Sequence, residues 1–136
     1  MLNTSSFIKG LVAAFVVSVV GDMLWHNVLF ADFYNQRLMR MTGGTVPGFS
    51  AFIIVVELLA AAVTTYFVLA AARKRTAAEG AFHGALIGFA MVGAVNFLNH
   101  ALFPLWDATL VSVDTAWGVL LGAAAGASVI AVVGRK

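Results

Sequence analysis

The sequence contains no cysteine, and only 10% of its 136 residues are charged. Without cysteine, disulfide bonds, thiol catalysis, thiolate metal sites and iron–sulfur clusters are excluded. So little charge excludes a soluble globular domain, in which about 25% of residues are charged. It also excludes intrinsic disorder, which requires low hydrophobicity together with high charge. The net charge of +2 is too small to indicate nucleic acid as a partner.

Apolar residues are abundant instead, at 62% of the chain with a mean hydropathy of +0.98. A membrane-spanning helix needs about 20 apolar residues, and four stretches qualify, at residues 7–31, 49–72, 80–103 and 108–134. They are expected to be helices, because open strands leave backbone groups unpaired in lipid. We therefore predict an all-α membrane protein: one integral domain over residues 1–136, a four-transmembrane-helix bundle embedded in the lipid bilayer.

The distribution of positive charge predicts the orientation of the bundle. Two arginines, Arg37 and Arg40, lie in the first loop. The two termini and the second loop hold the other six positive residues, namely Lys9, Arg73, Lys74, Arg75, Arg135 and Lys136. Positively charged loops stay in the cytoplasm, so we expect both termini to be cytoplasmic in a bacterial inner membrane. Residues 32–44 are then outside, as a short surface helix or a plain loop.

Ionisable side chains inside the spans are the informative ones, because lipid makes them costly. They are Asp22, His26, Glu57, His100 and Asp114. At about 1.5 Å per residue, all of them fall in the outer half of the membrane. Asp22 and His26 share a helix face by their i,i+4 spacing, as do Asn96 and His100. Together with Asn99 and Trp117, these side chains predict a polar pocket that faces outward.

Several functions fit such a pocket. The leading one is binding or transport of a small solute, a cation or a proton, since histidine exchanges protons near neutral pH. A purely structural role is the simplest alternative, because polar side chains also join helices. Metal binding is another, with His26, His100, Glu57, Asp114 and Asp22 as candidate ligands, and haem ligation by the two histidines is a variant of it. The sequence identifies no cofactor.

Two further interpretations concern the chain as a whole. An enzyme is less favoured, because no GxSxG nucleophile motif and no phosphate-binding loop is present. An accessory or structural subunit of a larger membrane complex, without chemistry of its own, is the main alternative to a binding protein. The tryptophans Trp25, Trp106 and Trp117 fit interface anchors better than ligand platforms.

Glycines repeat every four residues on the last two spans. They are Gly80, Gly84 and Gly88 on the third span, and Gly118, Gly122 and Gly126 on the fourth. Such glycine-zipper ridges let helix backbones approach closely, so we expect tight packing within this hairpin, with homo-oligomer contact as the alternative. Residues 26–30 also resemble residues 99–103, which suggests two repeated hairpins related by an axis along the membrane normal.

The C-terminal motifs resemble a family of small predicted bacterial membrane proteins that is catalogued as a domain of unknown function. The residues that carry this resemblance are Asn96-Phe97-Leu98-Asn99-His100, Trp106 and Val113-Asp114-Thr115-Ala116-Trp117-Gly118, together with Asp22, Leu24, Trp25 and Tyr34. The chain departs from the pattern at Asn96, where the family has an acid, and at His100, where it has an apolar residue. The resemblance implies a four-span inner-membrane fold and no established activity.

Overall fold

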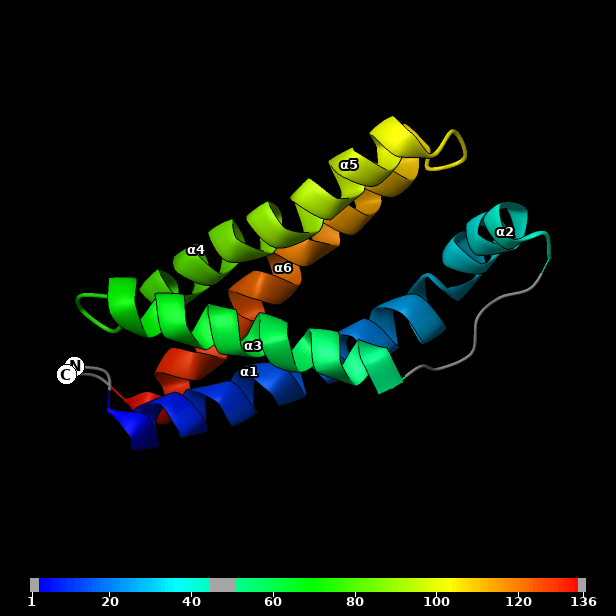
Figure 1. Cartoon of the computed structure of the whole chain (residues 1–136). Helices are drawn as coiled ribbons and strands as arrows, with labels where there is room; N and C mark the ends of the chain where they lie inside the picture. Colours follow the sequence, from blue (N-terminus) through cyan, green and yellow to red (C-terminus); the bar gives the residue numbers. More distant parts are fainter. Residues whose placement is uncertain (1–2, 45–50, 135–136) are drawn as a thin grey trace.

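The computed structural model describes residues 3–44 and 51–134, and all the regular structure in these two ranges is helical. Figure 1 shows the helices in order along the chain. They are α1 (Thr4–Leu24), η1 (Trp25–Leu29), α2 (Ala31–Thr42), α3 (Ala51–Ala71), α4 (Ala77–Gly88), η2 (Phe89–Gly93), α5 (Ala94–Leu102) and α6 (Ala108–Val133). The segments η1 and η2 are single π-helical turns that continue α1 and α4.

Four helices are long and apolar enough to cross a membrane, as predicted. They cover Thr4–Leu29, Ala51–Ala71, Ala77–Leu102 and Ala108–Val133. The all-α fold and the four spans are therefore confirmed, with ends that differ from the prediction by a few residues. Residues 49–50, at the predicted start of the second span, lie outside the described ranges.

Polar side chains determine where three of the spans begin. Asn3 accepts a hydrogen bond from the backbone N–H of Ser5 at the start of α1, and Thr76 accepts one from Glu79 at the start of α4. Asp107 does the same for Leu110 at the start of α6. Such N-caps satisfy backbone donors that the first helical turn leaves free.

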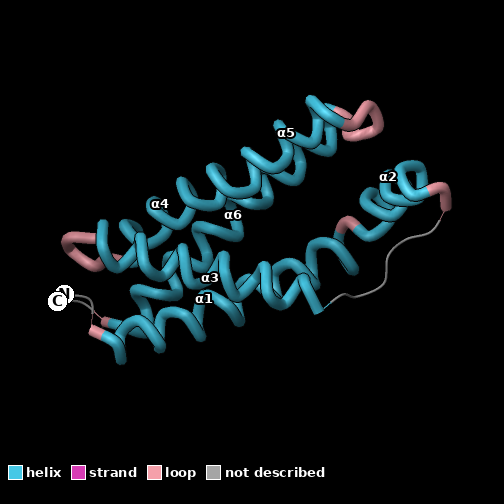
Figure 2. Tube along the Cα trace, viewed as in Figure 1, coloured by secondary structure: helices cyan, strands magenta, loops and turns pink. Residues whose placement is uncertain are grey.

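The bundle has two distinct ends (Figures 1 and 2). The start of α1, the end of α6 and the α3–α4 loop lie together at what we call the terminal end. The surface helix α2 and the α5–α6 loop lie at the opposite end, which we call the α2 end. Lys9 and residues 73–75 are at the terminal end, whereas Arg37 and Arg40 are on α2. Arg135 and Lys136 lie outside the described residues.

The helix α2 occupies the stretch for which the sequence left open a helix or a plain loop. It ends at Gly43, whose φ of 74° is in the left-handed region that glycine adopts without strain. It also carries its apolar and polar residues on different faces, as expected of a helix that lies on a membrane surface.

The tightest helix contact joins α4 to α6 through the two glycine rows. A Cβ atom built on Gly84 would collide with the backbone carbonyl of Gly122, and one on Gly88 would collide with that of Gly118. Only glycine allows backbones to come this close. The terminal half of the bundle is completed by small and β-branched residues of α1, α3 and α6, namely Ala14, Ala61, Val68 and Val129.

The π-helical turns are a feature that the hydrophobic pattern did not predict. The first, η1, contains most of residues 26–30, whereas the similar stretch 99–103 lies in and just after the regular helix α5. The two copies of the proposed repeat therefore differ in local structure. Isolated π turns of this kind are common at functional sites, and η1 carries His26 into the polar cluster described next.

Candidate functional site

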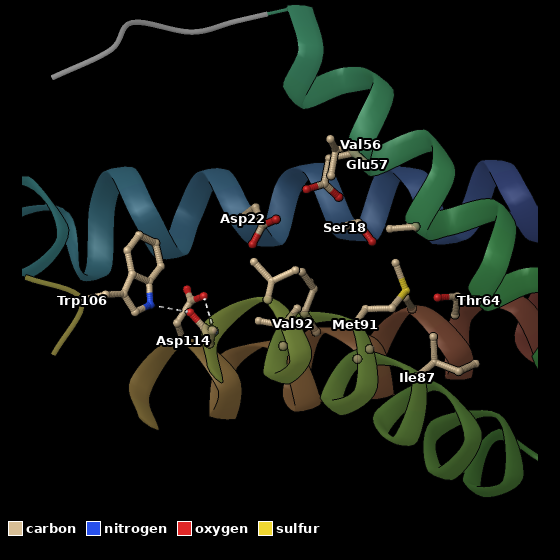
Figure 3. A pocket seen from close by; sticks show the side chains of 18 residues that line it. Ser18, Asp22, Val56, Glu57, Thr64, Ile87, Met91, Val92, Trp106 and Asp114 are labelled. Carbon is tan, nitrogen blue, oxygen red and sulfur yellow. Dashed lines mark hydrogen bonds between the residues drawn. The ribbon is translucent and has the colours of Figure 1, made fainter. Parts of the chain in front are cut away.

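A cavity of about 340 Å³ lies between α1, α3, the α4–η2–α5 helix and α6 (Figure 3). Its end nearer to α2 is polar, where Asp22, Glu57, Asn96 and Asp114 contribute side chains. Each of the four spans supplies at least one of them. The structure thus brings residues that are far apart in the sequence to one wall of a single cavity.

Asp114 of α6 is the acceptor at the centre of the polar cluster. Its Oδ1 accepts a hydrogen bond of 2.9 Å from the Tyr34 hydroxyl, and its Oδ2 accepts one of 2.8 Å from Nδ2 of Asn96. Nε2 of His26 lies 3.5 Å from Oδ1. One carboxylate therefore connects η1, α2, α5 and α6.

Tyr34 was not predicted as a site residue. It comes from the surface helix α2, is only 8% exposed, and accepts a 3.0 Å hydrogen bond from Nε1 of Trp25. Burial raises the pKa of the Tyr34 phenol, so the hydroxyl stays protonated and donates to Asp114. The only signal for Tyr34 in the sequence was its place in the family pattern.

Asp22 of α1 is held by a tryptophan on α6. Nε1 of Trp117 donates to Oδ1 of Asp22 at 2.6 Å, and the Trp117 ring stacks on Trp25 with centroids 4.4 Å apart. Nδ1 of His26 lies 3.1 Å from the backbone carbonyl of Asp22 and, because a carbonyl oxygen only accepts, Nδ1 is the donor.

Asn96 is the most buried member of the cluster, at 1% exposure. Its Oδ1 accepts a hydrogen bond of 3.1 Å from Nε1 of Trp106, and its Nδ2 also reaches the Thr115 hydroxyl at 3.3 Å. All three tryptophans therefore give their indole N–H to this cluster. Interface anchoring alone does not describe them, because an indole N–H that is removed from water needs an acceptor.

Glu57 of α3 differs from the other two acids. Its side chain points from α3 toward the α1 side of the cavity, where its carboxyl group interacts with that of Asp22 (Figure 3). In the part of the chain that the structure describes, no N–H group donates a hydrogen bond to Glu57. Its polar partner among the described residues is therefore the carboxyl group of Asp22, and a hydrogen bond between the two requires a shared proton.

Two predicted site residues lie outside the cluster. His100 is exposed, and its Nδ1 lies 2.6 Å from the backbone carbonyl of Trp106 in the α5–α6 loop. Asn99 is partly exposed, and its backbone carbonyl accepts from Phe103. Among the described residues, no three His, Asp or Glu side chains are arranged to hold a metal ion. The metal interpretation, which relied on His26 and His100 together, gains no support.

The surface helix α2 is attached to the bundle by an ion pair as well as by Tyr34. Nε of Arg37 lies 3.1 Å from Oδ2 of Asp107, and Oδ1 of Asp107 caps α6 by accepting from Leu110. The Leu110 backbone N–H lowers the pKa of Asp107, and the Arg37 guanidinium adds to this effect. Asp107 thus connects the N-terminus of α6 to α2.

We expect Asp107→Ala to lower the free energy of unfolding by about 1 kcal/mol at neutral pH, which is the usual value of an N-cap. A carboxylate whose pKa is lower in the folded state stabilises above its unfolded pKa of about 3.9 and loses this effect as the pH falls through the lowered value. The difference from the wild type should therefore shrink near pH 3. Denaturant unfolding in detergent micelles measures it. Thr109→Ala, at an exposed position in the first turn of α6, should show no such pH dependence.

The comparison with known families agrees with this architecture. A family model described as a predicted membrane protein, DUF2177, matches residues 7–131. The resemblance seen in the two terminal regions of the sequence is confirmed, and the match extends through the middle of the chain. No curated protein and no solved structure matches the chain.

Proposed function

The chain belongs to the DUF2177 family of predicted membrane proteins, and from this premise we propose that its pocket binds a small cation that enters from the outer side of a bacterial inner membrane. The orientation follows the positive residues, since Lys9 and residues 73–75 lie at the terminal end and such residues stay in the cytoplasm. The α2 end and the acidic wall of the cavity then face outward.

The observation that carries this proposal is the position of Glu57. Asp114 receives hydrogen bonds from Tyr34 and Asn96, and Asp22 receives one from Trp117. These hydrogen bonds give Asp114 and Asp22 a structural role, which is a sufficient reason for their presence inside the membrane spans. Glu57 has no such role, yet it places a carboxyl group beside Asp22 inside the membrane, where an acid is costly. A cation between the two carboxylates would remove their repulsion.

The charge of the cavity wall supports the same conclusion. Three acids line it, and no lysine or arginine is among the lining residues of the described chain. The His26 imidazole lies beside this wall, with one ring nitrogen 3.5 Å from Asp114 and the other 3.5 Å from Asp22. A proton shared by Asp22 and Glu57 would neutralise the same charge, so protons and the cation compete for one place.

Binding fits the geometry better than free conduction through a single copy. Beyond the cavity, toward the terminal end, α4 and α6 are in backbone contact at Gly80 and Gly126. The core at this level is formed by apolar residues such as Val68 and Val129, both fully buried. A solute that enters from the α2 end therefore meets a closed half of the bundle.

We expect Glu57→Gln to weaken cation binding at least about tenfold, because a charge pair at an effective dielectric constant near 20 is worth several kcal/mol. The probe is radiolabelled methylammonium, titrated at neutral pH into the protein held in phosphatidylcholine nanodiscs. The wild type should bind it saturably, at one site per chain. The melting temperature of Glu57→Gln should stay close to that of the wild type, because no hydrogen-bond donor is lost.

Asp32→Asn is the matched control, since it removes an exposed carboxylate of α2 from outside the cavity. It should bind methylammonium as the wild type does. Absence of saturable binding to the wild type, or equal binding to Glu57→Gln, would overturn the proposal. If either of these results is obtained and the protein is also extracted from its native membrane in complex with a second protein chain, the accessory-subunit interpretation replaces the cation-binding proposal.

A further inference from the structure

Two hydroxyl groups line the cavity without a hydrogen-bond partner among the described residues. Ser18 of α1 and Thr64 of α3 are each only 6% exposed, and both line the cavity (Figure 3). Neither hydroxyl makes a hydrogen bond within the described part of the chain. Hydroxyls in helices usually bond to a carbonyl in the preceding turn, as Ser112 does with Ala108 here. Because both residues line the cavity and neither hydroxyl bonds to the protein, each can bond to a polar group inside the cavity.

The hydroxyls lie at a defined distance from the acids. Ser18 is one turn before Asp22 on α1, and Thr64 is two turns after Glu57 on α3. At 1.5 Å per residue these separations are about 6 and 10 Å along the helix axes, in both cases toward the terminal end. The cavity therefore has an acidic end and a hydroxyl end, and a ligand that reaches both must be elongated.

The wall between the two ends is apolar. It is formed by Ile87, Met91, Val92 and Leu121 (the first three are labelled in Figure 3). A small hydrated ion would not cover this apolar wall, which would then remain in contact with water. Burial of an alkyl chain against it is favourable, by about 0.8 kcal/mol for each methylene.

The cavity also opens sideways. Helix α3 packs beside α1, α4 and α6, but among the described residues none of its Cα atoms lies within 8 Å of a Cα atom of α5. Figure 1 shows the two helices diverging toward the α2 end. Val56 of α3 and Val95 of α5 line the cavity and are 60% and 57% exposed. Both belong to membrane spans, so this opening faces lipid, and a ligand that partitions into the bilayer can enter through it.

We propose, on the basis of the cation site above, that the ligand is an amphipathic amino alcohol. Its ammonium group lies between Asp22 and Glu57, its alkyl chain lies against the apolar wall, and its hydroxyl group exchanges hydrogen bonds with Ser18 and Thr64. The opening between α3 and α5 gives it access from the membrane.

Three probes test this class of ligand in the nanodiscs described above: methylamine, hexylamine and aminohexanol. Hexylamine should bind the wild type at least about tenfold more tightly than methylamine, since each buried methylene is worth about fourfold in affinity. Aminohexanol should bind at least as tightly as hexylamine, although its hydroxyl group is better solvated in water. The measured quantity is the ratio of the two affinities, which is compared between variants in one bilayer.

The double variant Ser18→Ala, Thr64→Val removes both hydroxyls with little change of volume. We expect it to shift the ratio toward hexylamine by about two- to tenfold, the range of one net hydrogen bond. Because partitioning of each probe into the bilayer is the same for both proteins, it cancels in this comparison. An unchanged ratio would overturn the assignment of the hydroxyl end.

A filling variant tests the apolar wall separately. Ala60 lines the cavity and Ala70 is exposed on the same helix. Ala60→Leu should weaken the binding of hexylamine more than that of methylamine, and Ala70→Leu should change the affinity for neither amine. If methylamine binds in a Glu57-dependent way but hexylamine binds no more tightly, the amphipathic ligand is wrong and the cation site stands. If no amine binds, both proposals fail.

Discussion

Gly84→Ala is expected to destabilise the bundle by about 2 kcal/mol, although alanine is the better helix former. A Cβ atom at this position collides with the backbone carbonyl of Gly122 and lies 3.0 Å from the Cα atom of Gly126. Backbone atoms of a helix cannot rotate away as a side chain can, so the α4–α6 contact must widen. Overpacking in a close-packed interior costs about 1–3 kcal/mol. Unfolding of the protein in mixed micelles with increasing dodecyl sulfate measures the loss.

Gly93→Ala is the matched control on the same span. The atom nearest to its Cβ position is Cγ2 of Thr115 at 3.4 Å, an ordinary contact distance. Alanine is favoured over glycine in a helix by up to about 1 kcal/mol, so this variant should be as stable as the wild type or more stable. Equal stability of Gly84→Ala and Gly93→Ala would show that the glycine rows do not hold α4 against α6.

The tight hairpin has a consequence for the cavity. The close α4–α6 contact runs from the Gly80–Gly126 pair to the Gly88–Gly118 pair. The cavity lies on the side of this contact that faces α1 and α3. Helices α3 and α5 are farther apart, since no Cα atom of one lies within 8 Å of a Cα atom of the other in the described chain. One wall of the cavity is therefore fixed by backbone contact, and the wider spacing of α3 and α5 is the side on which we propose that the ligand enters.

The fold was predictable because hydropathy alone identifies membrane spans. All four spans were located within a few residues, and Asn3, Thr76 and Asp107 explain the starts of three of them. The two π-helical turns were not predictable, since they change the helical phase without changing the apolar composition. The sequence did not decide whether the stretch that forms α2 is a helix or a plain loop, because its apolar residues are compatible with either one at a membrane surface.

The candidate site was predictable only in part. The i,i+4 spacing placed Asp22 and His26 on one face correctly, because they share a helix. The same rule failed for His100, which follows Asn96 by four residues. Near the end of α5, the Trp106 carbonyl offers His100 a local acceptor, whereas Asn96 faces the interior. Spacing describes one helix, and it does not show what the neighbouring loop provides.

The contact between Tyr34 and Asp114 shows the other limit of sequence reasoning. The two residues are 80 positions apart, and their hydrogen bond depends on where α2 lies at the end of the bundle (Figure 1). Nothing in the local pattern around Tyr34 indicates a buried hydroxyl. The three indole donors were missed for the same reason, since a tryptophan near a span end fits an interface anchor until its N–H is seen to meet an acceptor.

Asp114→Ala is expected to be the most destabilising single change in the polar cluster, at about 3 kcal/mol. It removes the acceptor of Tyr34 and Asn96 and one of the two carboxylates beside the His26 imidazole. Tyr34 and Asn96 are buried, and each buried donor that loses its partner costs about 1–3 kcal/mol. Micelle unfolding measures the stability, and near-ultraviolet circular dichroism reports on the stacked Trp25 and Trp117 rings.

Comparison with Glu57→Gln separates the two kinds of acid. Asp114→Ala should unfold early and lose the tryptophan signal, whereas Glu57→Gln should keep both its stability and its spectrum and lose only methylammonium. Tyr34→Phe, which removes a single donor to Asp114, should fall between them at about 1 kcal/mol. If Asp114→Ala were as stable as the wild type, its hydrogen bonds would not hold the bundle together. Asp114 would then belong with Glu57, and the binding site would extend over the whole acidic wall.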